Sequence, residues 1–263
     1  MLHNSQKDFI RRHIGPSEKD QEKMLKDLNF KSLDEFINST IPEKIQFKGE
    51  LNIGEPNSEY EALRKLKAIS KKNQIYSNFI GMGYYGTYTP YVILRNILEN
   101  PGWYTSYTPY QPEVAQGRLE MLLNFQQMIV DFTGMDIANA SLLDEGTAAA
   151  EAMGLSHRLN KSDSNLVFVS ENCHPQTIDV IQTRAEPMGL KVLVGNEDKV
   201  LEQLKEDIVC GVLQYPGTLG DIKDPSEAIS KIHKKNGKAI LVCDLLALSM
   251  LKTPRELGAD IAV

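Results

Sequence analysis

Two polar residues stand at the ends of apolar segments, where an α/β protein places its chemistry. His174 lies in Glu-Asn-Cys-His-Pro, directly after residues 166–170, and Asp244 ends the run Ala-Ile-Leu-Val-Cys-Asp. A histidine there can stack on a cofactor ring or transfer a proton, and its position is equally explained by loop packing or by capping the next helix. A carboxylate that closes an apolar strand needs a cationic ring nitrogen, a backbone N–H or water as its partner.

A third candidate is the polar turn at residues 144–147, Asp-Glu-Gly-Thr, which opens a helix of small residues. Backbone N–H groups at a helix start can bind a phosphate. The acidic side chains of Asp144 and Glu145 oppose an anion, however. Glu145, Gly146 and Thr147 are therefore a weak phosphate-binding signal on their own.

Most of the ten tyrosines and the only tryptophan lie between Tyr76 and Tyr110. Glycines and prolines interrupt this segment, which predicts that the rings sit on ordered loops. Such rings either pack the loops onto the body of the protein or line a ligand pocket or subunit interface. The sequence leaves both interpretations open.

Alternating strands and helices must position these residues. Apolar, β-branched runs at 166–170, 192–194, 209–214 and 239–244 alternate with helical stretches at 175–187, 198–206 and 225–236, after a helix at 118–132 that stops at Gly134. This alternation predicts an α/β fold with a mostly parallel sheet flanked by helices. In such a sheet, ligands bind beyond the carboxyl ends of the strands, where His174 and Asp244 fall.

The chain divides into three parts by composition. Residues 1–75 are polar and helical, and the capping-box patterns Ser32…Glu35 and Ser58…Glu61 each open an apolar-periodic segment. We expect residues 1–75 to be an extension that embraces another surface. The aromatic segment 76–117 and the α/β domain 118–263 follow.

Composition excludes several classes of function. With 41% apolar and 24% charged residues the chain is an ordinary globular protein, and its net charge of −6 has no clustered basic face for nucleic acid. Three widely spaced cysteines argue against a disulfide framework and a thiolate zinc site, and favour a reducing compartment. No apolar run approaches the roughly 18 residues of a membrane helix.

Several long motifs resemble those of one family. They are Phe-Ile-Arg-Arg-His-Ile-Gly-Pro-Ser at 9–17, Gly-Met-Gly-Tyr-Tyr at 81–85, Tyr-Thr-Pro-Tyr-Gln-Pro-Glu-Val-Ala-Gln-Gly-Arg-Leu-Glu at 107–120, Ala-Ser-Leu-Leu-Asp-Glu-Gly-Thr-Ala-Ala-Ala-Glu-Ala-Met at 140–153, Cys-His-Pro-Gln-Thr, Gln-Tyr-Pro-Gly-Thr and Asp-Leu-Leu-Ala-Leu. Over essentially its whole length, the chain resembles the N-terminal part of the P-proteins of the glycine cleavage system, which are glycine dehydrogenases (decarboxylating).

The resemblance implies a fold-type-I pyridoxal 5'-phosphate (PLP) enzyme that releases the carboxylate of glycine as CO2 and passes the aminomethyl group to the lipoyl arm of H-protein. It implies that the Schiff-base lysine belongs to a C-terminal half or partner subunit, within an oligomer. His174 and Asp244 take the places of the ring-stacking histidine and the ring-nitrogen aspartate, and Glu145, Gly146 and Thr147 that of the phosphate loop. In this chain they form a pseudo-site with no catalytic residue of its own.

On this resemblance, the aromatic loops are stronger functional candidates than the pseudo-site. We expect six of their residues to face the cofactor cleft of the partner half. They are Tyr84, Tyr85, Tyr107, Tyr110, Gln111 and Glu113. Residues 257–263 indicate a helix end leading into a strand that stops mid-element, so we expect a truncated chain and an incomplete domain. The expected location is the bacterial cytoplasm or, in a eukaryote, the mitochondrial matrix.

Two other functions stay open. The chain is alternatively a non-catalytic module that supports a partner and binds no cofactor. A weaker interpretation is a different fold-type-I relative, such as a decarboxylase of a larger amino acid.

Overall fold

The computed structural model describes residues 12–13, 15–54 and 56–263, and the chain forms two compact units, Met1–Ser77 and Asn78–Val263. Part of the motif at 9–17 lies outside the described residues. The expected division at residue 117 stays a prediction.

The first unit is built from short capped helices. Ser58 and Glu61 form a complete capping box at the start of α4, as predicted. At α3 the box is incomplete: Ser32 accepts from the backbone N–H of Glu35, but the Glu35 carboxylate accepts from the N–H of Lys31 instead. The elements are α2 (Glu18–Asp27), α3 (Leu33–Thr40), η1 (Glu43–Ile45) and α4 (Glu59–Ser70).

The apolar face predicted on α4 exists but is uncovered. Leu63 is 67% exposed, and Leu66 and Ile69 are similarly exposed. Of the described residues in α2, α3 and α4, none is buried. A helix with an exposed apolar stripe is stabilised by covering it. That this extension lies against another surface stays a prediction.

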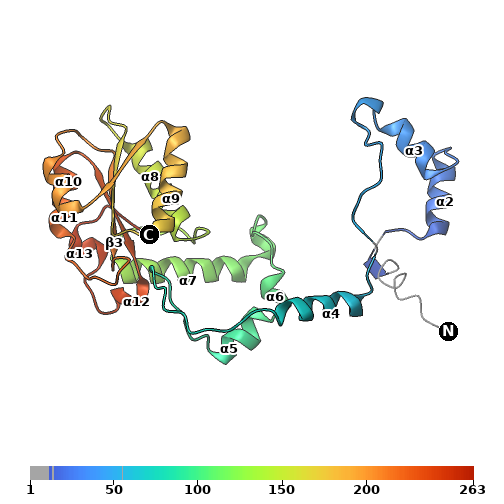
Figure 1. Cartoon of the computed structure of the whole chain (residues 1–263), viewed down its shortest axis with the longest axis horizontal. Helices are drawn as coiled ribbons and strands as arrows, with labels where there is room; N and C mark the ends of the chain where they lie inside the picture. Colours follow the sequence, from blue (N-terminus) through green and yellow to red (C-terminus); the bar gives the residue numbers. More distant parts are fainter. Residues whose placement is uncertain (1–11, 14, 55) are drawn as a thin grey trace. The chain divides into compact units, whose positions relative to one another are not determined.

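The second unit is centred on a five-stranded parallel sheet (Figure 1) with the order β2-β1-β3-β4-β5. The order reverses between β1 and β3, so the loops that follow these two strands diverge and leave a crevice. The strands are β1 (Leu166–Ser170), β2 (Lys191–Gly195), β3 (Cys210–Tyr215), β4 (Lys238–Cys243) and β5 (Ile261–Ala262). The predicted parallel sheet, and the strand expected after residue 257, are confirmed.

Helices cover both faces of the sheet. Figure 1 shows α8 and α9 on one side and α10 and α11 on the other. Their bounds are α8 (Glu145–Leu159), α9 (Pro175–Ala185), α10 (Glu197–Gln203) and α11 (Ser226–Lys234), and the short α12 (Leu245–Leu248) and α13 (Pro254–Leu257) follow β4. The predicted sheet flanked by helices is therefore confirmed.

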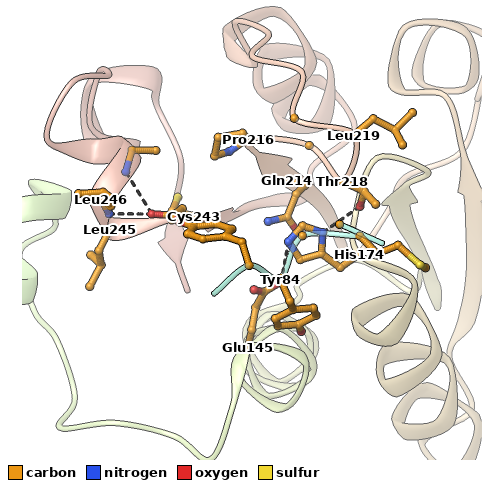
Figure 2. A pocket seen from close by; sticks show the side chains of 18 of the residues that line it. Tyr84, Glu145, His174, Gln214, Pro216, Thr218, Leu219, Cys243, Leu245 and Leu246 are labelled. Atoms are coloured by element: carbon orange, nitrogen blue, oxygen red, sulfur yellow. Dashed lines mark hydrogen bonds and ion pairs between the residues drawn. The ribbon is translucent and has the colours of Figure 1, made fainter. Parts of the chain in front are cut away.

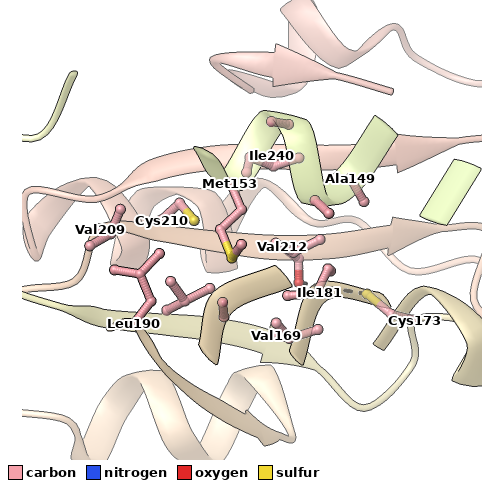
Figure 3. Close-up of a cluster of buried hydrophobic side chains, with 14 of the residues drawn as sticks. Ala149, Met153, Val169, Cys173, Ile181, Leu190, Val209, Cys210, Val212 and Ile240 are labelled. Carbon is pink, nitrogen blue, oxygen red and sulfur yellow. Dashed lines mark hydrogen bonds between the residues drawn. The ribbon is translucent and has the colours of Figure 1, made fainter. Parts of the chain in front are cut away.

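The core is divided between the two faces by the strand alternation. In β1, Val167 and Val169 pack with Met153 of α8 on one face (Figure 3), while Phe168 joins Ile232 on the other. All five side chains are fully buried. Because both faces are covered, the strands read as continuous apolar runs rather than alternating ones.

The aromatic segment forms short irregular helices before the long helix α7. Pro90 is the residue before the first turn of this segment. Gly134 ends α7 with φ of 70°, as predicted. The elements are α5 (Tyr91–Ile93), the π-helical η2 (Leu94–Leu98), α6 (Pro101–Tyr104), η3 (Pro112–Val114) and α7 (Gln116–Thr133). Within the described part of the chain, no helix is long and apolar enough to cross a membrane.

Candidate functional site

An open cleft of about 790 Å³ lies at the carboxyl ends of β1, β3 and β4, where the strand order reverses. Its walls come from the loop before the α/β domain, the start of α8, and the segments that follow the three strands. It contains Tyr84, Tyr85, Glu145, His174 and Asp244. The structure thus brings together five predicted site residues that are up to 160 positions apart. His174 and Asp244 meet there because parallel strands deliver their carboxyl ends to one edge.

His174 is buried and held by a relay of hydrogen bonds (Figure 2). Its Nδ1 lies 2.8 Å from Oγ1 of Thr218, and the same hydroxyl donates to the backbone carbonyl of Asn172 at 2.9 Å. Because the hydroxyl proton is used on that carbonyl, Nδ1 must carry the proton that it shares with Thr218. The imidazole is thereby fixed, with Nε2 at 3.8 Å from Oε1 of Glu145.

One face of the imidazole is covered by backbone. A methyl group added at Gly83 would lie 2.1 Å from Cε1 of His174 and 2.3 Å from both ring nitrogens. The Tyr84 ring lies beside the imidazole, with a centroid distance of 5.6 Å and a tilt of 51°. His174 also occupies the position before α9, although its side chain makes no capping hydrogen bond there.

Asp244 uses both carboxylate oxygens within the chain. Oδ1 accepts from the N–H groups of Leu246 and Ala247 at 2.7 and 3.1 Å, which caps α12, and Oδ2 accepts from the Tyr85 hydroxyl at 2.5 Å. The Tyr85 hydrogen bond, followed by the two backbone bonds, lowers the pKa of Asp244 below its ordinary 3.8. The same hydrogen bond, together with the charge of Asp244, raises the pKa of Tyr85 above 10.

The predicted phosphate turn does not face the cleft as a whole. Asp144 accepts from the N–H of Thr147 at 2.8 Å, so one of the free N–H groups at the start of α8 is already taken. Gly146 is buried against α9, where an added methyl would meet Val180 at 3.3 Å. Among the described residues of this turn, Glu145 alone lines the cleft. A phosphate-binding role of Gly146 and Thr147 stays a prediction.

The remaining candidate residues of the aromatic segment line two separate hollows. Tyr107, Tyr110 and Gln111 line a groove of about 690 Å³, together with Arg118, whose guanidinium lies 5.4 Å from the centre of the Trp103 ring. Glu113 lines a shallower hollow with the first turns of α7. The aromatic candidates therefore form two groups, with Tyr84 and Tyr85 at the cleft and Tyr107, Tyr110 and Gln111 at the groove.

Sequence reasoning missed Gly83 and Thr218 as site residues. Gly83 had a signal, because Gly-Met-Gly is typical of a loop that needs left-handed residues, and the structure has φ of 70°, 59° and 87° at Gly81, Met82 and Gly83. Thr218 belongs to the Gln-Tyr-Pro-Gly-Thr motif, but it contacts His174 only because β1 and β3 are neighbours in the sheet. The sequence gives no direct sign of that pairing.

Residues 11–263 match the family described as glycine cleavage system P-protein. The chain belongs to this family. Glycine dehydrogenase (decarboxylating) from Pelagibacter ubique is 79% identical over all of this chain, which covers 27% of that protein. The protein of the same name from Stutzerimonas stutzeri is 53% identical over 97% of the chain, which covers 26% of it. The chain thus spans about a quarter of the length of these curated relatives.

Solved structures agree with the family and the fold. The crystal structure of a glycine decarboxylase (P-protein) in inhibitor-bound form superposes with a TM-score of 0.83 at 30% identity, over 95% of this chain and 57% of that one. Sphingosine-1-phosphate lyase from Burkholderia pseudomallei, at 15% identity, has a TM-score of 0.52 over 76% of this chain and 50% of that one. The second likeness concerns the fold alone. Together with the parallel sheet, these structures confirm the expected fold class.

The P-protein resemblance implies PLP, and the residues of this cleft do not fit it. One face of the His174 imidazole is covered by Gly83, and Oδ2 of Asp244 already accepts a hydrogen bond from the neutral phenol of Tyr85. Among the described residues that line the cleft, none is lysine or arginine, whereas Glu145 and Asp244 both are acidic. A dianionic phosphate would meet two carboxylates and no cation. The lining of this cleft therefore disfavours both the ring and the phosphate of PLP.

Proposed function

We propose that this chain is the part of a glycine dehydrogenase (decarboxylating) that builds a wall beside a cofactor held elsewhere in the enzyme. The complete enzyme decarboxylates glycine and transfers the aminomethyl group to the lipoyl group of H-protein. The observation that carries this proposal is the match to the P-protein family over residues 11–263, with 79% identity to the Pelagibacter relative.

In the complete enzyme, PLP supplies an electron sink for the pair left on glycine when CO2 departs. We assign its Schiff-base lysine to the rest of the protein or to a partner subunit. Two facts support this assignment: the chain spans about a quarter of its relatives, and its own cleft opposes both the ring and the phosphate.

The aromatic segment is our candidate for the surface that meets the cofactor-bearing part. Tyr107 and Tyr110 are 81% and 77% exposed, and their rings are tilted against one another at 6.0 Å between centroids. Exposed tyrosines with a neighbouring arginine are typical of binding surfaces, since they bury large areas at a small entropic cost. We propose that Tyr84, Tyr85, Tyr107, Tyr110, Gln111 and Glu113 face the partner's cofactor cleft.

Oligomer formation, binding of lipoylated H-protein and a location in the bacterial cytoplasm or mitochondrial matrix belong to the same proposal. They rest on the family alone. The division into an extension (1–75), an aromatic interface segment (76–117) and an incomplete α/β domain (118–263) is likewise proposed. It agrees with the uncovered apolar stripe of α4.

The test is glycine-dependent exchange of isotope-labelled bicarbonate in the complete enzyme, assembled with this chain and with H-protein. We expect exchange with glycine, and none from this chain alone. Exchange with a larger amino acid but not with glycine would overturn the substrate assignment in favour of another decarboxylase.

A second candidate function is a supporting module that contributes no surface to the active site, and the poor fit of PLP to the cleft favours it. The variants Tyr107→Ala and Tyr110→Ala in the complete enzyme distinguish the two. Replacing a residue that forms the wall of the active site should raise the KM for glycine or lower kcat by about tenfold or more. Unchanged kinetics in both variants, matched to a Tyr60→Ala control in the exposed part of α4, would favour the supporting module.

A further inference from the structure

The loop Gly81–Tyr85 enters the cleft at the carboxyl ends of β1, β3 and β4, where an open α/β sheet binds its ligand. It precedes the α/β domain in sequence and is held at two separate points. One is beside β1, at His174, and the other is beside β4, at Asp244. These are two of the polar groups that the sheet brings to the cleft, and both are engaged by the chain itself.

The first point is a close approach that only glycine allows. Gly83 lies over the imidazole so closely that one added carbon would overlap all three of the nearest ring atoms, at 2.1 to 2.3 Å. Its φ of 87° also lies in the left-handed region. The imidazole cannot withdraw easily, because Nδ1 is bound to Thr218 and the side chain is 7% exposed.

The second point is the 2.5 Å hydrogen bond from Tyr85 to Oδ2 of Asp244. The other carboxylate oxygen is occupied by two backbone N–H groups of α12, so the carboxylate has a fixed orientation toward the loop. A hydrogen bond to a charged acceptor is stronger than one between neutral groups. Asp244 therefore holds the loop from the far side of the cleft.

The loop conformation itself needs these restraints. Three successive residues have φ between 59° and 87°, and the middle one is Met82, which has a Cβ. A left-handed conformation is strained for a residue with a Cβ. Such a conformation persists only where surrounding contacts determine it. Gly83 and Tyr85, which both follow Met82, supply such contacts here.

We propose that Gly81–Tyr85 is a built-in occupant of this cleft, and that His174 and Asp244 are positioning residues that hold the loop rather than ligands of a cofactor. The loop engages the two groups that a bound ring would contact, and it presents Tyr84 and Tyr85 from a fixed backbone. His174 and Asp244 are consequently unavailable to a planar ring phosphate, although the cleft beside the loop is open. This inference does not rest on the proposed function, since it concerns a contact within the chain.

Hydrogen exchange followed by mass spectrometry tests the proposal without turnover. In the full chain, Tyr85→Phe should raise the exchange rate of amides in residues 81–86 by about fivefold, the effect of losing one net hydrogen bond. Exchange in β1, β3 and β4 should stay unchanged. Tyr88→Phe is the matched control, because Tyr88 is a fully exposed tyrosine of the same segment.

The coupling to Asp244 is tested by a double variant. Asp244→Asn retains an oxygen that can cap α12, and Tyr85→Phe combined with Asp244→Asn should exchange no faster in the loop than Tyr85→Phe alone. Additive effects, or a Tyr85→Phe rate equal to that of wild type, would overturn the proposal. So would an increase that spreads over the whole sheet, because that result indicates general destabilisation.

A ligand arm uses pyridoxine 5'-phosphate, which has the ring and phosphate of the cofactor but no aldehyde to react with surface lysines. We expect millimolar ligand to leave exchange in the loop and in the segments around His174 and Asp244 unchanged. A saturable change there would show that the cleft accepts a ring phosphate and would contradict the built-in occupant. Neither the variant experiments nor the ligand experiment measures activity of the complete enzyme. A result that contradicts the built-in occupant therefore leaves the proposed function standing.

Discussion

The phenol of Tyr85 donates a 2.5 Å hydrogen bond to Oδ2 of Asp244, a residue 159 positions later in the chain. The contact joins a loop that precedes the α/β domain to the end of its fourth strand. It also explains why Asp244 is fully satisfied without any ligand, since its other oxygen caps α12. A residue that the family resemblance assigns to a cofactor nitrogen thus has a partner within its own chain.

This contact should limit the pH range over which the loop is held. The Tyr85 hydrogen bond lowers the pKa of Asp244 below 3.8. The stabilisation that the Asp244 carboxylate gives the closed loop is therefore present above pH 3.8 and is lost as pH falls through the pKa of the folded state. The pKa of Tyr85 is raised above 10, so the stabilisation from its neutral phenol is present below pH 10 and is lost as pH rises through the pKa of the folded state. The loop should be held between the two.

Ultraviolet difference titration checks the alkaline limit. The difference between wild type and Tyr85→Phe isolates one phenol, which should ionise above the ordinary value of 10. Tyr88→Phe supplies the control difference for an exposed tyrosine of the same loop segment. A Tyr85 phenol that ionises at or below 10 would be incompatible with the charged partner.

Gly83→Ala should open the loop without unfolding the domain. The added carbon overlaps the His174 ring and the residue must keep φ of 87°, which together destabilise the closed loop by about 1–3 kcal/mol. Limited chymotrypsin digestion should cleave faster after Tyr84 and Tyr85. Gly86→Ala is the matched control, because an added carbon there has no neighbour within 4 Å. Equal cleavage of the two variants would argue against the close approach.

Cys243 should be unreactive although it lines the cleft. Burial, and then the charges of Glu145 and Asp244, raises the pKa of its thiol to about 12. At pH 8 only about one Cys243 side chain in ten thousand is then ionised. Because the thiolate is the nucleophile, the native thiol should react slowly. Iodoacetamide should label Cys243 only after unfolding in guanidinium. Labelling of the native protein at the rate of a free cysteine would refute the buried environment.

The core on the α8 side should depend on Met153. This side chain is 0% exposed between α8 and the sheet, so Met153→Ala should lower the free energy of unfolding by about 2–5 kcal/mol in urea denaturation. Met250→Ala makes the same change at a site that is 88% exposed, and should cost less than about 0.5 kcal/mol. Similar losses in the two variants would mean that the α8 layer is not packed as described.

The sequence predicted the α/β part of the fold well, because strands buried on both faces leave uninterrupted apolar runs. The runs at 166–170 and 239–244 match β1 and β4 to within one residue at each end. Prediction was weaker where local geometry decides. At α3, the Glu35 carboxylate turns to the N–H of Lys31 rather than to that of Ser32, although the Ser-x-x-Glu pattern is intact.

The site was predictable only in part. His174 and Asp244 could be placed in one cleft because parallel strands end at one edge of a sheet. Their real partners, Thr218 and Tyr85, come from segments 44 and 159 residues away, and no periodicity reports such contacts. The separation of Tyr84 and Tyr85 from Tyr107 and Tyr110 likewise depends on how the irregular segment between them folds.

We propose that the cofactor of the enzyme is held outside this chain, beside a wall that the chain supplies. Borohydride reduction of the complete enzyme with PLP, followed by peptide mapping, locates the cofactor lysine. We expect one stoichiometric phosphopyridoxyl-lysine, located outside residues 1–263. A stoichiometric phosphopyridoxyl group on a lysine within residues 1–263 would contradict it.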